Sequence, residues 1–121
     1  MLKGRKHPFS LLVGVALSDM MEDNTGNLCV WPKSHYFIHE HSRWPDGQIR
    51  RSRGWTKEDG ALPDLGKPLQ LKMRAGDVVL LHSQMAHCGG PLESPNIRYM
   101  MYFRVRHTDW ARMVADGECV R

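Results

Sequence analysis

The sequence predicts an all-β fold, arranged as an antiparallel sandwich or barrel. Three observations carry this prediction: five runs of apolar or alternating residues are typical of strands, Gly- and Pro-rich turns separate them, and helical patterns are limited to a short stretch at residues 56–59 and to residues 109–115. Short strands separated by turns are characteristic of sandwiches and barrels. The length of 121 residues allows a single domain, residues 1–121.

The first two runs lie close together in the sequence. Residues 9–17, FSLLVGVAL, are apolar on both faces, which predicts a strand buried between two layers. Residues 28–31 form a shorter run that ends at Pro32. The polar segment between the two runs contains the turn sequence Asn-Thr-Gly-Asn. The spacing therefore predicts a hairpin of these two strands, with residues 19–26 as its loop.

The second half of the chain begins with a long irregular segment. Residues 36–67 are turn-rich without a sustained strand or helix period, which predicts a long loop or insertion. Residues 69–73 then alternate apolar and polar positions, and residues 78–82 form another apolar run. In residues 97–107 the odd positions are apolar and the even positions are mixed and basic. A regular strand would therefore aim Arg98 into a cleft rather than a core.

Composition and charge argue against several classes of function. The net charge of +4 is mild and forms no basic block that could cover a face, so we expect neither nucleic acid nor a membrane surface as a partner. The longest apolar run is far too short to cross a bilayer. Three cysteines without Cys-x-x-Cys spacing suit a reducing compartment rather than a disulfide framework. We therefore expect an intracellular, cytoplasmic protein.

Two side chains carry the chemistry that the sequence suggests. His87 lies where a strand-like run meets a Gly/Pro-rich turn, and Arg98 lies at the start of the last run. An imidazole can ligate a metal, and a guanidinium can hold a carboxylate by two parallel hydrogen bonds. The alternatives are a histidine that is hydrogen-bonded at a strand end and an arginine that is solvated on a strand. We expect His82, five residues earlier, to pack in the core.

Three ordered segments together carry a resemblance to a known family. They are GNLCVWPKSH at residues 26–35, RAGDVV at residues 74–79, and HCGGPLESPNIR at residues 87–98. They resemble the phytanoyl-CoA dioxygenase family. The resemblance implies a double-stranded β-helix, or jelly roll, that uses iron(II) and 2-oxoglutarate. It also implies that His87 is a metal ligand and that Arg98 and Ser94 bind 2-oxoglutarate.

The resemblance also shows departures from the family pattern. In the family a His-x-Asp pair and the later histidine hold the metal, and the pair precedes the strand that resembles residues 9–17. Here His7 is followed by no carboxylate. The sequence His-Thr-Asp at residues 107–109 would lie about 30 Å along a strand from Arg98. Lys33 stands where the family has glycine. The domain therefore resembles a jelly roll that is incomplete at its N-terminus.

Two functions remain open on this basis, and the sequence does not decide whether the chain is an enzyme. The first is an iron(II)- and 2-oxoglutarate-dependent dioxygenase of the phytanoyl-CoA dioxygenase type, which hydroxylates a small organic or acyl substrate but is nearly inactive as this chain. The second is a non-catalytic jelly-roll binding module or fragment without a competent metal site. An incomplete barrel would expose a sheet edge and apolar surface, through which we expect a homo-oligomer.

Overall fold

The computed structural model describes residues 10–41, 64–109 and 112, and this part of the chain contains six strands and one helix. The elements are β1 (Leu11–Ala16), β2 (Leu28–Val30), α1 (Ser34–His41), β3 (Leu69–Gln70), β4 (Val78–His82), β5 (His87–Gly89) and β6 (Met100–Val105). The predicted all-β fold is therefore confirmed. The predicted closing helix at 109–115 falls almost entirely outside the described residues.

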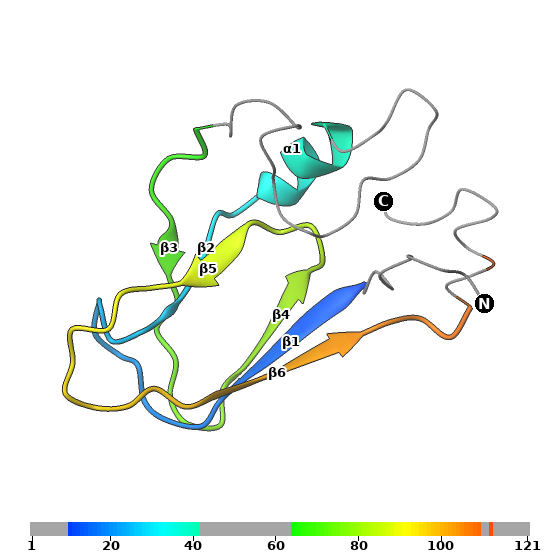
Figure 1. Cartoon of the computed structure of the whole chain (residues 1–121). Helices are drawn as coiled ribbons and strands as arrows, with labels where there is room; N and C mark the ends of the chain where they lie inside the picture. The colour runs from blue at the N-terminus through cyan, green and yellow to red at the C-terminus, as the bar shows by residue number, and fades with distance from the viewer. Residues whose placement is uncertain (1–9, 42–63, 110–111, 113–121) are drawn as a thin grey trace, which may run out of the picture.

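The strands form two antiparallel sheets of three strands each (Figure 1). The large sheet has the order β4-β1-β6 and the small sheet has the order β3-β2-β5. β1 is the centre of the large sheet, paired with β4 from Leu11↔His82 to Val15↔Val78 and with β6 from Leu11↔Val105 to Ala16↔Met100. Each sheet ends in two edge strands, so the described strands form no closed barrel, and jelly-roll closure stays a prediction.

The predicted hairpin between residues 9–17 and residues 28–31 is wrong. β1 and β2 lie in different sheets and have no partner in common. The chain between them crosses from one sheet to the other, and the bridges Met20↔Met73 and Thr25↔Leu92 fix its path. Both edges of β1 are taken by strands from the second half of the chain. Spacing along the sequence cannot reveal such distant partners, which explains the error.

The hydrophobic core lies between the two sheets. Leu12 and Leu81 of the large sheet pack against Leu28 and Val30 of the small sheet. A second buried cluster of Ala16, Met20 and Met73 continues this core. Burial of apolar surface stabilises a fold by roughly 25 cal/mol for each Å² removed from water. We call the sides of the two sheets that face this core their inner faces.

The opposite side of the large sheet, which we call its outer face, is apolar and exposed. Directly paired residues of antiparallel strands share a face, and alternate residues of one strand do too. By the register, the outer face consists of Val78, Leu80, His82, Leu11, Val13, Val15, Met101, Phe103 and Val105. Leu80 is 63% exposed and Phe103 is 49% exposed. Apolar surface of this kind is typical of an interaction site.

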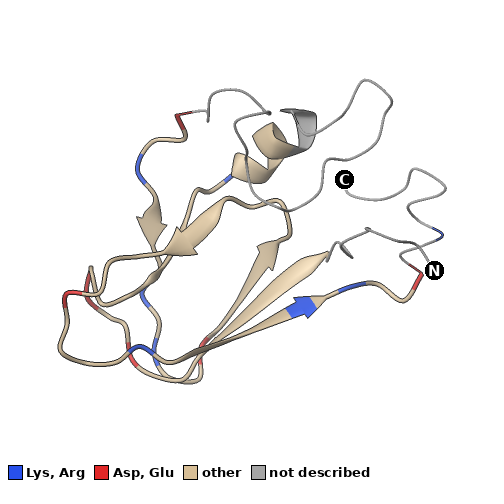
Figure 2. Ribbon diagram, viewed as in Figure 1, with Lys and Arg blue, Asp and Glu red and all other residues tan. Residues whose placement is uncertain are grey.

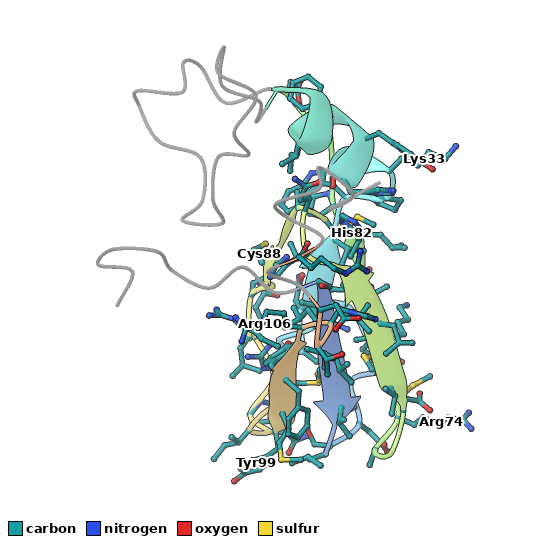
Figure 3. All side chains as sticks on the ribbon, turned by 90° about the vertical axis from the view of Figure 1, so that its right-hand side faces the viewer. Lys33, Arg74, His82, Cys88, Tyr99 and Arg106 are labelled. Atoms are coloured by element: carbon teal, nitrogen blue, oxygen red, sulfur yellow. The ribbon has the colours of Figure 1, made fainter. Side chains whose placement is uncertain are left out.

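The helix α1 occupies the start of the segment 36–67, for which the sequence predicts a loop; residues 42–63 lie outside the described residues. Its histidine, tyrosine, phenylalanine and isoleucine residues are only moderate helix formers. Tertiary contacts therefore decide its structure. The ring of His35 lies against the ring of His82, with 5.2 Å between the ring centroids. Figure 3 shows His82 at the end of β4 that is nearest to α1.

Charged side chains lie mainly in the segments that connect the strands (Figure 2). Within the described strands, Arg104 is the one lysine, arginine, aspartate or glutamate. No helix in the described part of the chain has the length and apolar character that a membrane span requires.

Candidate functional site

His87 begins β5 and is directed toward the inner face of the small sheet. The register pairs His87 with Val30 and Gly89 with Leu28. Leu28 and Val30 pack into the core between the sheets, and directly paired residues share a face. The imidazole therefore points into the space between the two sheets. Because β5 is an edge strand, the side chain is nevertheless exposed.

One ring nitrogen of His87 is held by the backbone. Nδ1 lies 2.8 Å from the carbonyl oxygen of Met85. A carbonyl oxygen can only accept a hydrogen bond, so in the neutral ring the proton lies on Nδ1. The lone pair then resides on Nε2. A histidine that ligates a metal commonly has its other nitrogen fixed in this way.

Arg98 lies on the same face of β5 as His87. Its Nη1 donates a hydrogen bond to the carbonyl oxygen of Gly26 at 3.0 Å. The same Nη1 is 3.9 Å from the point where a Cβ would project from Gly89. Gly89 and His87 are two residues apart on one strand, so their side-chain directions share the inner face, with their Cα atoms about 7 Å apart. The guanidinium and the imidazole therefore face the same space.

The charge of Arg98 has no carboxylate partner among the described residues. The ion pair found in this part of the chain joins Lys72 to Asp23 at 3.5 Å, in an exposed position. A guanidinium has five N–H donors, and the carbonyl of Gly26 engages one nitrogen. The remaining donors of this half-buried side chain are available to an anion. Their planar arrangement matches a carboxylate better than an ammonium group would.

Gly26 is a glycine for two structural reasons. Its φ angle is 79°, in the left-handed region that side chains other than glycine rarely adopt. A Cβ at this position would also lie 3.1 Å from Cδ of Arg98. The Arg98 side chain thus packs directly over the backbone to which it donates, and this contact orients the guanidinium.

Asn27 supports this arrangement and was not expected to do so. From the sequence it is one residue of a polar turn, but its side chain is completely buried. Its amide nitrogen donates to the backbone carbonyls of Met20, Glu22 and Leu71. Its amide oxygen accepts a hydrogen bond from the backbone N–H of Thr25. The network fixes the backbone next to Gly26. An asparagine directly before a buried strand is the signal that could have indicated this role.

Ser94 lies beside Arg98 but not beside His87. A pocket of about 250 Å³ is lined by Asp19, Met21, Glu22, Thr25, Ser94, Asn96, Ile97 and Arg98. The hydroxyl of Ser94 accepts a hydrogen bond from the backbone N–H of Asn96 at 3.1 Å. His87 does not line this pocket. Of the three predicted residues, the structure therefore brings Ser94 and Arg98 to one pocket.

β6 contributes three further side chains to the inner face of the large sheet. Its outer-face positions are odd-numbered, so Met100, Tyr102 and Arg104 point inward. A Cβ on Gly14 would lie 3.1 Å from Cε1 of Tyr102 and 3.3 Å from Cε of Met100. The absence of a side chain at Gly14 therefore lets the Tyr102 ring lie close over β1, on the side that faces the small sheet.

Cys29 and Cys88 form a pair on the other side of the small sheet. They are directly opposite one another on β2 and β5, and alternate with the inward-facing residues. Burial, followed by the charge and the hydrogen bond of Cys88, raises the pKa of the Cys29 thiol. Cys29 therefore stays protonated to higher pH than an exposed thiol. Because the pair faces away from His87, it adds no ligand to that histidine.

The donor chemistry of His87 fits one ligand position of an iron(II) site. A neutral imidazole with a free Nε2 suits this ion, which is commonly held by two histidines and a carboxylate. Among the side chains that the structure describes, no three His, Cys, Asp or Glu residues lie close enough to hold a metal ion. His107, in the His-Thr-Asp sequence, follows the end of β6, whereas Arg98 precedes its start. Among the described residues, His87 is thus a candidate for one ligand position only.

The fold and the site define an all-β protein that presents a histidine and an arginine without a carboxylate partner among the described residues on one inner face, an arrangement suited to a metal and a carboxylate. The chain belongs to the phytanoyl-CoA dioxygenase (PhyH) family, whose family model matches residues 3–100. This family is generally iron(II)- and 2-oxoglutarate-dependent. No curated protein matches the sequence. The chain is therefore a member of a dioxygenase family.

Proposed function

We propose that this chain holds one metal ligand and the cosubstrate of an iron(II)- and 2-oxoglutarate-dependent dioxygenase that hydroxylates a small organic or acyl substrate. The observation that carries the proposal is the guanidinium of Arg98. It lies on the same face of β5 as His87 and, within the described residues, has no carboxylate partner. The mild net charge of +4 supports a small-molecule partner rather than nucleic acid or a membrane.

Each residue has a distinct part in this proposal. His87 presents Nε2 to the metal because Met85 holds the proton on Nδ1. Arg98 binds the distal carboxylate of 2-oxoglutarate through donors that Gly26 leaves available, and Ser94 adds a hydroxyl beside it. When bound, iron(II) supplies the oxygen activation that couples decarboxylation of 2-oxoglutarate to hydroxylation.

A non-catalytic binding module is the second candidate. It is favoured by the incomplete ligand set: the part of the chain that the structure describes does not bring a set of three possible metal ligands together. In such a module Arg98 would still bind a carboxylate, because its orientation depends on Gly26 and not on a metal. The two candidates therefore share the anion site and differ in metal-dependent turnover.

The decisive experiment measures conversion of 2-oxoglutarate to succinate by the purified chain, with and without iron(II). The dioxygenase proposal expects a low rate that requires iron, is abolished in His87→Ala and is unchanged in His107→Ala. The matched control is also an exposed histidine, located beyond the end of β6. Binding of 2-oxoglutarate without any succinate would support the binding module. Neither binding nor turnover would contradict both functions.

A further inference from the structure

The turn that delivers His87 is attached to the helix α1 by one buried hydroxyl. Ser34, the first residue of α1, is 5% exposed. Its Oγ accepts a hydrogen bond from the backbone N–H of Ala86 at 2.8 Å and donates to Sδ of Met85 at 3.4 Å. A single side chain thus contacts the two residues that immediately precede His87.

These contacts differ from those of an ordinary helix-capping serine. A capping hydroxyl accepts a hydrogen bond from an N–H in the first turn of its own helix. In the described part of the chain, the hydrogen bonds of the Ser34 hydroxyl go to the β4–β5 turn instead, and the one with Ala86 spans 52 positions of sequence. The contact is therefore a tertiary one, and its effect falls on the turn.

The rest of the turn is also held by the backbone. The carbonyl oxygen of Ala86 accepts from the N–H of Trp31 at 3.0 Å, and the N–H of Met85 donates to the carbonyl oxygen of His82 at 2.9 Å. Ala86 is thus fixed at both its N–H and its carbonyl. The carbonyl of Met85, which lies between these contacts, is directed at Nδ1 of His87 at 2.8 Å.

We infer that Ser34 is a positioning residue for His87: by holding Met85 and Ala86 in place, it keeps the Met85 carbonyl against Nδ1 and so fixes both the tautomer and the orientation of the ring. Without this contact the ring of an exposed histidine would turn, and either nitrogen could carry the proton. The inference rests on the proposed function only for the statement that His87 binds a metal. The effect on the tautomer is a property of the metal-free chain.

The test compares the tautomer of His87 in the metal-free chain and in variants, by nuclear magnetic resonance of ¹⁵N-labelled imidazole. We expect the Nδ1–H tautomer in the wild-type chain and in Ser34→Thr, which keeps the hydroxyl. Ser34→Ala is expected to give a mixture of both tautomers. Ser34→Cys introduces a thiol of similar size that hydrogen-bonds more weakly, and it is expected to give an intermediate proportion of the Nδ1–H tautomer. Ser83→Ala removes a hydroxyl from the same turn and is expected to leave the tautomer unchanged.

A titration with zinc(II), followed at Nε2 of His87, measures the consequence for metal binding. Loss of an outer-shell contact typically lowers metal affinity 10- to 100-fold, and we expect this loss in Ser34→Ala and recovery in Ser34→Thr. An unchanged tautomer in both Ser34→Ala and Ser34→Cys would overturn the inference. Zinc that does not bind His87 even in the wild-type chain would overturn the metal-ligand role in the proposed function. The tautomer comparison would still decide the role of Ser34.

Discussion

The two sheets of this protein are held together in different ways. The strands of the large sheet have five or six residues, with long regular registers and almost entirely apolar side chains. The strands of the small sheet have only two or three residues. The small sheet depends on buried polar side chains, Asn27 and Ser34, that bond to backbone groups far along the chain.

This difference separates the contacts that stabilise the fold from those that orient the candidate site residues. Burial of apolar surface is favourable but non-directional, so the large sheet can supply most of the driving force without specifying where a reactive group points. Hydrogen bonds depend on distance and angle, so they can fix the position of one carbonyl or one imidazole. The candidate site is carried by the small sheet and by the segment before β6. The site therefore lies where hydrogen bonds, rather than long strands, hold the backbone in place.

The strongest test of this comparison is Asn27→Asp. The two side chains have the same shape, but a carboxylate only accepts hydrogen bonds, so three backbone carbonyls would each lose the hydrogen bond from Asn27. We expect the free energy of unfolding to fall by about 3 kcal/mol, as measured by urea denaturation. Asn96→Asp, at an exposed position, is the matched control and should change the free energy of unfolding by less than about 0.5 kcal/mol. Equal losses in both variants would contradict the role of Asn27.

The next largest effect concerns the anion site. Arg98→Lys keeps the positive charge but replaces a planar fork by a single ammonium group. We expect the affinity for 2-oxoglutarate, measured by calorimetry, to fall about tenfold, which corresponds to about 1.4 kcal/mol. Arg74→Lys is the control, because Figure 3 shows Arg74 pointing away from the molecule at the β3–β4 turn. Unchanged affinity in Arg98→Lys would contradict the carboxylate-binding role.

A smaller effect is expected where the backbone leaves β2 and enters α1. Lys33 has a φ angle of 68°, at the position where the resemblance expects glycine. The left-handed conformation costs an L-residue about 1 to 2 kcal/mol. Since Figure 3 shows the Lys33 side chain directed outward, Lys33→Gly should stabilise the fold by about 1 kcal/mol in thermal unfolding. Lys67→Gly, another exposed lysine but without a positive φ, should give no gain.

The smallest effect on stability is expected on the outer face of the large sheet. We propose that a second copy of the chain covers this face and the adjoining edge of β6, because the face is apolar, with His82 as its one polar residue. Phe103→Thr should shift the mass measured by light scattering toward the monomer value of 13.9 kDa. At concentrations low enough for the wild-type chain to be monomeric, the free energy of unfolding should change by less than about 0.5 kcal/mol. Met100→Thr, on the inner face of the same strand, should destabilise the core instead. A wild-type chain that is monomeric at all concentrations would contradict the proposal.

Much of the fold could be predicted from the sequence, and so could the identity of the candidate residues. The run at residues 78–82 coincides with β4, and the family implied by the three motifs is the one whose model matches the chain. Strand periodicity and motif residues are local properties, readable over a few positions. His87 and Arg98 could be named for the same reason, because both lie in the motif at residues 87–98 that resembles the family.

The tertiary structure alone decided which groups meet. Pairing placed β1 between β4 and β6 rather than beside β2, and tertiary contacts made Ser34–His41 a helix. The shared face of His87 and Arg98, and the supporting contacts of Asn27 and Ser34, depend on register between segments far apart in the chain. A shift of one residue in a strand reverses every side chain on it, so no local pattern can fix such a face.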